Sequence, residues 1–198
     1  MKSLVSNLPL VFVLFASSAY AACKGNCVDG SGKYYYSDGA YYEGEWSNGQ
    51  LNGRGFLYLP DGSRYTGDFV DGKLNGQATM YRSDGSWYQG KWKDDRRHGR
   101  GNYKNTRGDR YSGEWENDVI HGQGTYTYVN GDRYIGEFRN WQREGSGTYY
   151  YKSNGYRYVG EWKNNKKHGQ GAMYSKSGSK LRSGLWQNGT IKFDPEVY

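Results

Sequence analysis

Three histidines are the residues of this chain best suited to bind a metal or to move a proton. His98, His121 and His168 occupy the same place in a sequence pattern that returns about every 23 residues. If each copy of the pattern is a β-hairpin, neighbouring copies lie about 10 Å apart. One metal ion cannot bridge that distance. We therefore expect no metal site, and we interpret these histidines as turn-edge residues multiplied by duplication.

Carboxylates form a second periodic set that could supply an acid and a base. The set consists of Glu45, Asp68, Glu114, Glu137 and Glu161. A separation of about 10 Å loosely resembles that of the two carboxyl groups in inverting glycosidases. Alternation along a strand turns these side chains into solvent, however, and no nucleophile–histidine–acid set or phosphate-binding loop accompanies them. The sequence thus predicts no enzyme, no cofactor and no small-molecule substrate.

Cys23 and Cys27 are the only two cysteines. In an exported protein such a pair predicts a disulfide. The loop between them is short, so the entropic stabilisation is small and the bond serves to clamp the N-terminal end. Two thiols without a neighbouring histidine do not complete a zinc site.

The elements that must position these residues are copies of one unit. A tyrosine returns at intervals of 23, 23, 23, 23 and 24 residues, followed by Gly two positions later and a large ring four positions later. The tyrosines are Tyr42, Tyr65, Tyr88, Tyr111, Tyr134 and Tyr158, and the rings are Trp46, Phe69, Trp92, Trp115, Phe138 and Trp162. A Gly-x-Gly stretch then follows in most copies, for example Gly122 and Gly124. Periodic copies of this kind are typical of repeat architectures.

Partial copies at both ends are expected to cap the repeats. The predicted organisation is a signal peptide (1–21), a cysteine-containing cap with a half repeat (22–38), six repeats (39–178), and a partial repeat with the C-terminal tail (179–198).

These motifs resemble the MORN (membrane occupation and recognition nexus) repeat, from about Gly30 to Gly189. The stretches closest to its pattern are Tyr42–Trp46, His121–Gly124 and Glu161–Asn165, and the departures are Ala78 at a glycine position, Glu144, and Trp141 in a turn. The resemblance implies a row of β-hairpins that serves as an interaction scaffold or a membrane-associated scaffold. It does not identify a ligand.

The residue pattern itself leads to the same fold class. Tyr-x-Gly-x-Trp alternates with a period of two, which predicts a strand, and Gly-x-Gly-x-apolar predicts a second strand after a polar turn. The chain has 31 glycines and 22 tyrosines, with a mean hydropathy of −1.05. We therefore expect an all-β fold, an elongated single-layer meander of stacked hairpins whose core consists of rings packed on glycine.

The N-terminus has the pattern of an export signal. Lys2 is followed by the apolar run Leu8–Phe15, and Ala19-Tyr20-Ala21 matches an A-x-A cleavage site. The expected mature protein begins at Ala22 and is secreted or periplasmic. Lipid anchoring through Cys23 is the alternative, although Tyr20 stands where bacterial lipoprotein signals usually carry leucine.

Basic residues of the modestly basic chain, with a net charge of +7, gather in two clusters that we expect at hairpin turns. The clusters are Arg96, Arg97 and Arg100, and Lys163, Lys166 and Lys167. Solvated turns are the plain interpretation, and contact with anionic phospholipid is the alternative. Nucleic acid is not an expected partner of an exported protein.

Arg110, Arg133 and Arg157 precede the repeat tyrosine in three consecutive copies. They predict a basic ladder on the face opposite the core, with Ile135 and Val159 between it and the acidic set. Such a banded face suits an extended protein partner, or it simply keeps the sheet charged against aggregation. The off-pattern rings Tyr41, Trp87 and Trp141 leave carbohydrate as a minor alternative. The predicted function is a non-enzymatic exported scaffold for an unidentified protein partner.

Overall fold

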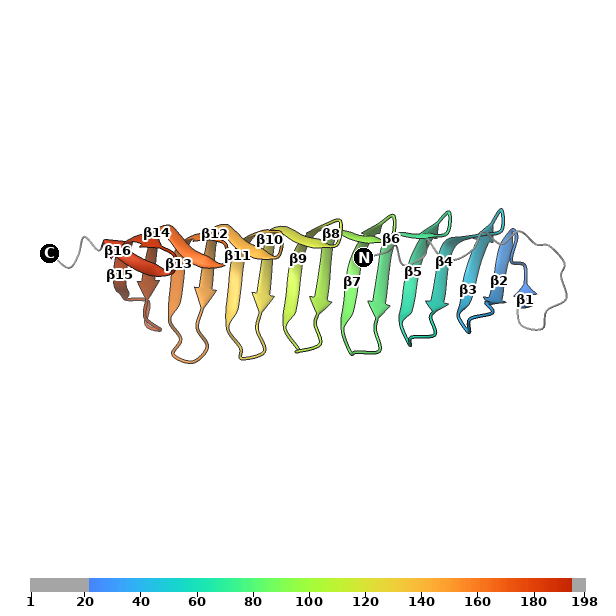
Figure 1. The fold of residues 1–198 in the computed structure, drawn as a ribbon, viewed down its shortest axis with the longest axis horizontal. Helices are drawn as coiled ribbons and strands as arrows, with labels where there is room; N and C mark the ends of the chain where they lie inside the picture. The colour runs from blue at the N-terminus through green and yellow to red at the C-terminus, as the bar shows by residue number, and fades with distance from the viewer. Residues whose placement is uncertain (1–21, 194–198) are drawn as a thin grey trace. The chain divides into compact units, whose positions relative to one another are not determined.

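The computed structural model describes residues 22–193, in which all regular structure is β-strand. Sixteen strands follow one another in chain order in one antiparallel sheet (Figure 1). This confirms the all-β meander of hairpins. The predicted signal peptide lies outside the described residues. Within the described range, no helix is long and apolar enough to cross a membrane.

The chain divides into two compact units, up to Gly101 and from Asn102, which are described separately. The strands of the first unit are β1 (Ala22–Gly25), β2 (Gly30–Tyr35), β3 (Tyr41–Ser47), β4 (Gln50–Tyr58), β5 (Arg64–Val70), β6 (Lys73–Tyr81) and β7 (Trp87–Lys93). The division falls in β8 (Arg96–Lys104). The strands of the second unit are β9 (Arg110–Glu116), β10 (Val119–Thr127), β11 (Arg133–Arg139), β12 (Gln142–Tyr150), β13 (Arg157–Lys163), β14 (Lys166–Tyr174), β15 (Lys180–Gln187) and β16 (Thr190–Phe193).

Five of the six repeat tyrosines pack against two glycines, and this contact forms the core, whereas Ala78 replaces the second glycine in the copy of Tyr65. Tyr134 is fully buried, and a Cβ added at Gly147 would lie 2.2 Å from its hydroxyl oxygen. A Cβ at Gly136 would lie 2.7 Å from the same atom. The hydroxyl donates a hydrogen bond to the carbonyl of Glu137 at 3.0 Å, so the polar end of the ring is satisfied. Burial raises the pKa of Tyr134, as expected for a phenol held in an apolar site.

The rings of successive hairpins meet edge to face. In the second unit, ring centroids lie 5.0 to 5.5 Å apart along a continuous column. The column runs through Trp115, Tyr111, Phe138, Tyr134, Trp162, Tyr158 and Trp186. The indole N–H of Trp162 also donates to the carbonyl of Gly147 in the preceding hairpin, at 3.2 Å. Each hairpin therefore completes the core of its neighbour, as expected for repeat proteins.

Two-residue turns join the strands at one end of the hairpins. Asn48 and Gly49 have φ values of 50° and 70°, which is typical of a type I′ turn. Trp141 occupies the second turn position with φ 67°, where a bulky residue is unusual. Its ring packs against Tyr103 and Trp115, with centroids 6.1 and 5.4 Å away. The backbone N–H of Trp141 donates to Ile120 at 3.2 Å, so the turn is bonded to the preceding hairpin.

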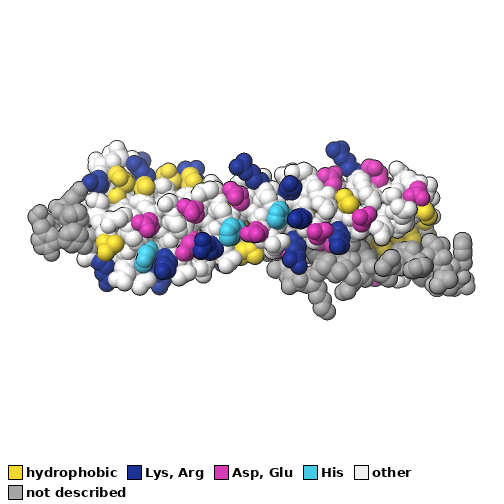
Figure 2. All heavy atoms as spheres, turned by 90° about the horizontal axis from the view of Figure 1, so that it is seen from above, with side chains coloured by type: hydrophobic (Ala, Val, Ile, Leu, Met, Phe, Trp, Pro, Cys, Tyr) yellow, Lys and Arg dark blue, Asp and Glu magenta, His cyan; other side chains and the backbone are white. Residues whose placement is uncertain are grey.

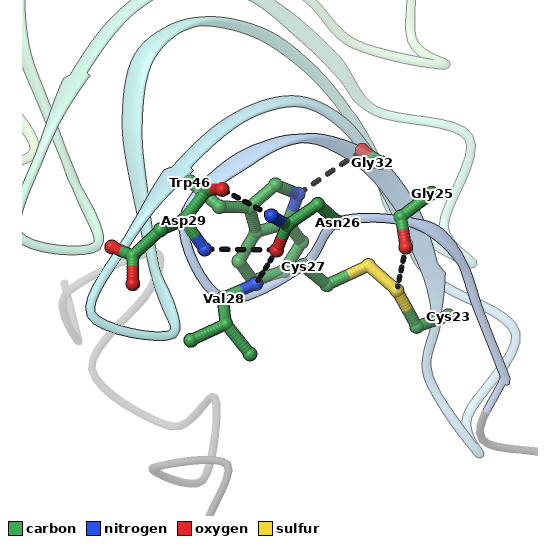
Figure 3. Close-up of a disulfide and its surroundings, with 8 residues drawn as sticks. All are labelled: Cys23, Gly25, Asn26, Cys27, Val28, Asp29, Gly32 and Trp46. Atoms are coloured by element: carbon green, nitrogen blue, oxygen red, sulfur yellow. Dashed lines mark hydrogen bonds between the residues drawn. A yellow bond between two sulfur atoms is a disulfide. The ribbon is translucent and has the colours of Figure 1, made fainter.

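The predicted disulfide between Cys23 and Cys27 is present and closes the N-terminal end (Figure 3). A Cβ at Gly32 would lie 2.8 Å from the sulfur of Cys27, so the bridge packs directly on β2. The carbonyl of Val28 and the carboxylate of Asp29 accept hydrogen bonds from the turn residues Gly49 and Asn48, at 3.0 and 2.8 Å. This clamped loop thus gives the first turn the support that later turns obtain from the preceding hairpin.

The glycine–ring contact predicts a large cost for a side chain at Gly113. A Cβ there would lie 2.4 Å from the hydroxyl oxygen of Tyr111 and 2.6 Å from the backbone of Gly124. We expect Gly113→Val to reduce the free energy of unfolding by about 3 kcal/mol through overpacking. Chemical denaturation would measure it. The control is Ser112→Val, because Ser112 is exposed on the opposite face. Equal stability of the two variants would contradict this account of the core.

Candidate functional site

The face of the second unit opposite the rings, here called the outer face, carries all five predicted partner-binding residues. Arg110 and Arg133 are exposed, and Arg157 is half-buried. Ile135 and Val159 are 38 % and 39 % exposed. The placement of the ladder on a non-core face is therefore as expected, whereas partner binding stays a prediction.

Tyrosines that the sequence analysis did not single out alternate with these arginines across the strands. Arg133 pairs with Tyr150, Tyr150 with Arg157, and Arg157 with Tyr174. The guanidinium carbons of Arg133 and Arg157 lie 4.9 and 4.7 Å from the ring centroids of Tyr150 and Tyr174. We call these four residues the Arg–Tyr row. Stacking orients each guanidinium and leaves its planar N–H fork available to an anion.

An apolar row runs beside the Arg–Tyr row. Ile135 pairs with Thr148, Thr148 with Val159, and Val159 with Ala172. Cross-strand neighbours on one face of a sheet lie about 5 Å apart, so these side chains form a continuous strip. The outer face of the second unit is therefore banded, with cations beside an apolar strip.

The periodic carboxylates that the sequence places beside this face have a structural role. Glu137 accepts a hydrogen bond from the backbone N–H of Ser146 at 3.1 Å, and Glu161 accepts one from Gln170 at 2.9 Å. The register shifts nearby, between Gly136 and Phe138, which marks a β-bulge. Glu45 and Asp68 bind the equivalent N–H groups of the first unit, at 3.0 and 2.9 Å. These carboxylates therefore satisfy backbone donors that the bulges leave without a partner strand.

The two basic clusters are not uniformly solvated. Arg96, Arg100, Lys163 and Lys166 are exposed, but Arg97 is only 8 % exposed, with its guanidinium carbon 5.8 Å from the ring centroid of Tyr88. Figure 2 shows basic and acidic side chains interspersed on the face that it views. The expectation that all six basic residues are solvent-facing turn charges therefore differs from what the structure shows for Arg97 and for Lys167.

Lys167 points toward the core rings. Its ammonium nitrogen lies 5.0 and 4.8 Å from the ring centroids of Tyr158 and Trp186. Burial lowers the pKa of Lys167, and the nearby charges of Arg182 and Arg143 lower it further. In the register of β13 and β14, Lys167 pairs with Trp162 as Leu51 pairs with Trp46 in the first unit. A cation here replaces an apolar residue of the repeat.

Arg143 holds the corresponding place opposite Phe138, and sequence reasoning missed it. Its guanidinium carbon lies 4.4 Å from the ring centroid of Trp162, and its terminal nitrogen donates to the carbonyl of Asn165 at 2.7 Å. Alignment of the copies at the position of Leu51 and Leu74 would have located both cations on the core face.

The first unit carries an aromatic cluster on its own outer face. Tyr35 pairs with Tyr41, and Tyr41 with Tyr58, with ring centroids 5.9 and 5.3 Å apart. The ammonium of Lys33 lies 4.1 Å from the centroid of Tyr41. The structure thus brings Tyr41 into a ring cluster. Trp87 pairs with Tyr81 on β6, and Trp141 lies in a turn of the second unit, so the three off-pattern rings share no single site.

The predicted histidine positions hold no shared site either. His98, His121 and His168 lie on β8, β10 and β14. Within residues 22–193, no group of three or more His, Cys, Asp or Glu residues is placed to hold a metal ion.

Stacked hairpins with a ring-filled core face define a β-hairpin repeat scaffold. The MORN repeat model matches residues 29–41, 42–64, 65–87, 88–110, 111–133, 134–156 and 158–180. The chain therefore belongs to the MORN-repeat family. No curated protein matches it in a sequence comparison.

A solved structure shares the fold at low sequence identity. The chain is similar to the TCP domain of SAS-4 of Drosophila melanogaster, solved in complex with a proline-rich motif of Ana2, with a TM-score of 0.52 and 14 % identity. The match covers 81 % of this chain and 87 % of that one. The G-box domain of the microcephaly protein CPAP matches with a TM-score of 0.43 and 11 % identity, over 79 % of this chain and 87 % of that one.

The position of Lys167 predicts a pH-dependent stability difference. Because folding lowers its pKa, the unfolded chain binds more protons between the lowered pKa and the ordinary value of 10.5. Folding stability contributed by this group therefore rises with pH through that window. We expect Lys167→Met to raise the thermal unfolding midpoint at pH 7, with an advantage that shrinks as the pH approaches 10.5.

Calorimetry of both proteins across this pH range would test the expectation. Lys166→Met is the matched control, because Lys166 is exposed and precedes Lys167 directly. Its difference from the parent should not change with pH. A Lys167→Met variant that is less stable at pH 7 would show that the cation–ring contacts outweigh the cost of burying the charge.

Proposed function

We propose that this protein is a non-enzymatic exported scaffold that binds an extended acidic segment of a protein partner on the outer face of its second unit. The observation that carries the proposal is the Arg–Tyr row. Arginines stacked on tyrosines are positioned before binding, which reduces the entropy lost when a carboxylate is bound. The adjacent strip with Ile135 and Val159 offers apolar contact to the same segment.

The spacing of the arginines indicates the conformation of that segment. Arg133 and Arg157 lie two strands apart, about 9.6 Å at 4.8 Å per strand. A polyproline II helix rises 3.1 Å per residue with three residues per turn, so every third side chain returns after about 9.3 Å. Side chains on one face of a β-strand return after about 6.7 Å, which does not match. A polyproline II segment with an acidic residue at every third position therefore fits the row.

The solved relative supports this choice of partner class. The SAS-4 TCP domain, which has the same fold, is described in complex with a proline-rich motif. Proline-rich segments favour polyproline II, and aromatic side chains commonly bind them. In this protein Tyr150 and Tyr174 supply rings on the exposed face.

Export is part of the proposal and is supported by the N-terminal pattern and by the disulfide. Disulfides persist in oxidising compartments. The bond to Cys27 also engages the sulfur of Cys23, the atom that a lipid anchor would require. We therefore favour a secreted or periplasmic protein without a lipid anchor.

Attachment to anionic phospholipid remains the second candidate. It would depend on the exposed residues Arg96, Arg100, Lys163 and Lys166, because Arg97 and Lys167 contact core rings. Lys163 and Lys166 pair directly across β13 and β14, and so form one compact basic spot.

A peptide series would test the proposed function. We expect a peptide of five Glu-Pro-Pro triplets to bind the purified protein more tightly than a peptide of the same composition with its glutamates grouped at one end. Arg133→Glu combined with Arg157→Glu should weaken binding at least about tenfold, since each change places like charges opposite one another. Fluorescence anisotropy of labelled peptides would give the affinities.

The matched control is Lys163→Glu combined with Lys166→Glu, which changes the net charge equally outside the Arg–Tyr row. It should leave peptide affinity unchanged, and it should abolish any sedimentation with anionic vesicles if the membrane candidate is correct. Equal affinity for both peptides would contradict the spacing argument. Absence of binding by either peptide would remove the proposed partner class.

A further inference from the structure

An open pocket of about 610 Å³ lies beside three consecutive turns of the second unit. These turns join β10 to β11, β12 to β13 and β14 to β15. Its cations are Arg133, Lys152 and Lys176, and its rings include Tyr150 and Tyr156. No acidic residue is among the residues that line it.

The pocket coincides with a repeat whose turn carries an extra residue. The spacing from Tyr134 to Tyr158 is 24 residues rather than 23. The extra residue widens the turn, in which Tyr151 N donates to Tyr156 O at 2.9 Å. The preceding turn is one residue shorter and is closed by Tyr128 N donating to Asp132 O. The insertion therefore gives this turn a shape that its neighbours lack.

A substitution in the same turn removes a link between turns. Asp132 accepts hydrogen bonds from Lys152 N and from the Tyr149 hydroxyl, both at 2.8 Å, and so binds the next turn to its own. Burial acts to raise the pKa of Asp132, but these hydrogen bonds lower it overall. One repeat later Tyr156 stands at this position, immediately before the arginine, and it has no carboxylate with which to bind the following turn.

The stem of each lysine lies beside the glycine of the preceding turn. A Cβ at Gly131 would lie 2.9 Å from Cγ of Lys152, and a Cβ at Gly155 would lie 2.9 Å from Cγ of Lys176. The aliphatic stems therefore lie against bare backbone, which directs the ammonium groups along the turns. Among the turns of the second unit, lysine occupies this position only in these two consecutive copies.

We infer that this pocket binds a phosphate or sulfate ester carried on a polar ring such as a sugar. Three cations without a lining carboxylate suit an oxyanion with more than one charge. The volume lies within the range of about 300–1,000 Å³ that is usual for small-ligand sites, so it accommodates a ring as well as the oxyanion. Tyr156 offers a ring against which the ligand's ring can pack, and Thr127, Ser153 and Asn154 offer hydrogen bonds to its hydroxyls.

This inference goes beyond the proposed function, because its ligand is a small molecule or a headgroup rather than a peptide. Isothermal titration calorimetry of the purified protein with glucose 6-phosphate, inorganic phosphate and glucose would test it. Vesicles of phosphatidylcholine with and without phosphatidylinositol 4-phosphate form the second arm. We expect glucose 6-phosphate to bind more tightly than phosphate, and glucose not to bind measurably.

Lys152→Gln combined with Lys176→Gln should weaken binding of the ester at least about tenfold, which corresponds to 1.4 kcal/mol. Lys163→Gln combined with Lys166→Gln removes the same charge outside the pocket and should have no effect. Binding of the phosphoinositide vesicles alone, lost in the pocket variant, would identify a lipid headgroup as the source of the ester.

Equal loss in both double variants would overturn the inference, because it would show general attraction to a basic protein. Failure of every phosphorylated probe to bind would overturn it as well. The pocket variant retains Arg133 and Arg157 and should still bind the acidic peptide, so failure of the pocket and failure of the peptide site are distinguishable.

Discussion

The packing of each tyrosine ring on bare backbone is the contact on which the remaining structure depends. A strand that contains glycine at every second position is poor in isolation, because glycine loses much backbone entropy and contributes no side chain. The ring of Tyr111 or Tyr158 fills that space, and its hydroxyl closes a hydrogen bond within the same strand. The same ring then meets the edge of an aromatic residue from the next hairpin. The same tyrosine ring thus stabilises its own hairpin and joins it to the next one, and a single hairpin alone would be marginally stable at best.

Because the core rings lie on one face of the sheet, most residues on the other face do not contribute to the core. Sheets commonly bury one face and expose the other, and here the buried face is filled by rings that contact one another from hairpin to hairpin. The outer face is then constrained only by solubility and by the bulge-binding carboxylates. Residues such as Arg133, Tyr150 and Arg157 are consequently free to be chosen for recognition. This separation explains how one repeat can be kept constant in its core and varied on its surface.

The sequence predicted the period, the strands and the disulfide, because each depends on the spacing of a few residue types. Sequence reasoning failed for residues whose surroundings depend on how the strands pair. Lys167 and Arg97 looked like turn charges because they stand beside other cations. In the structure, however, Lys167 pairs with Trp162 across the strands, and the guanidinium of Arg97 lies near the ring of Tyr88. The role of Glu137 was missed because a β-bulge is a property of strand pairing. Tyr150 was missed because its importance arises only from the cross-strand neighbour Arg133.

In a repeat protein, a copy that departs from the regular pattern indicates where a local site can form. In a row of equal turns, each turn can bind the next through a carboxylate such as Asp132, and lengthening one turn breaks that regular spacing. The cost is local, because the ring of Tyr158 and its glycines lie at a different position along the strands and keep the hairpin in place. A site can therefore be built at a turn by one insertion and one substitution, without disturbance of the core. The turn from Tyr151 to Tyr156 has both changes, and two lysines in successive copies supply charge at the same place. A scaffold of this kind can therefore gain a pocket at its turns without a change in its core, although this pocket shares Arg133 and Tyr150 with the outer face of the sheet.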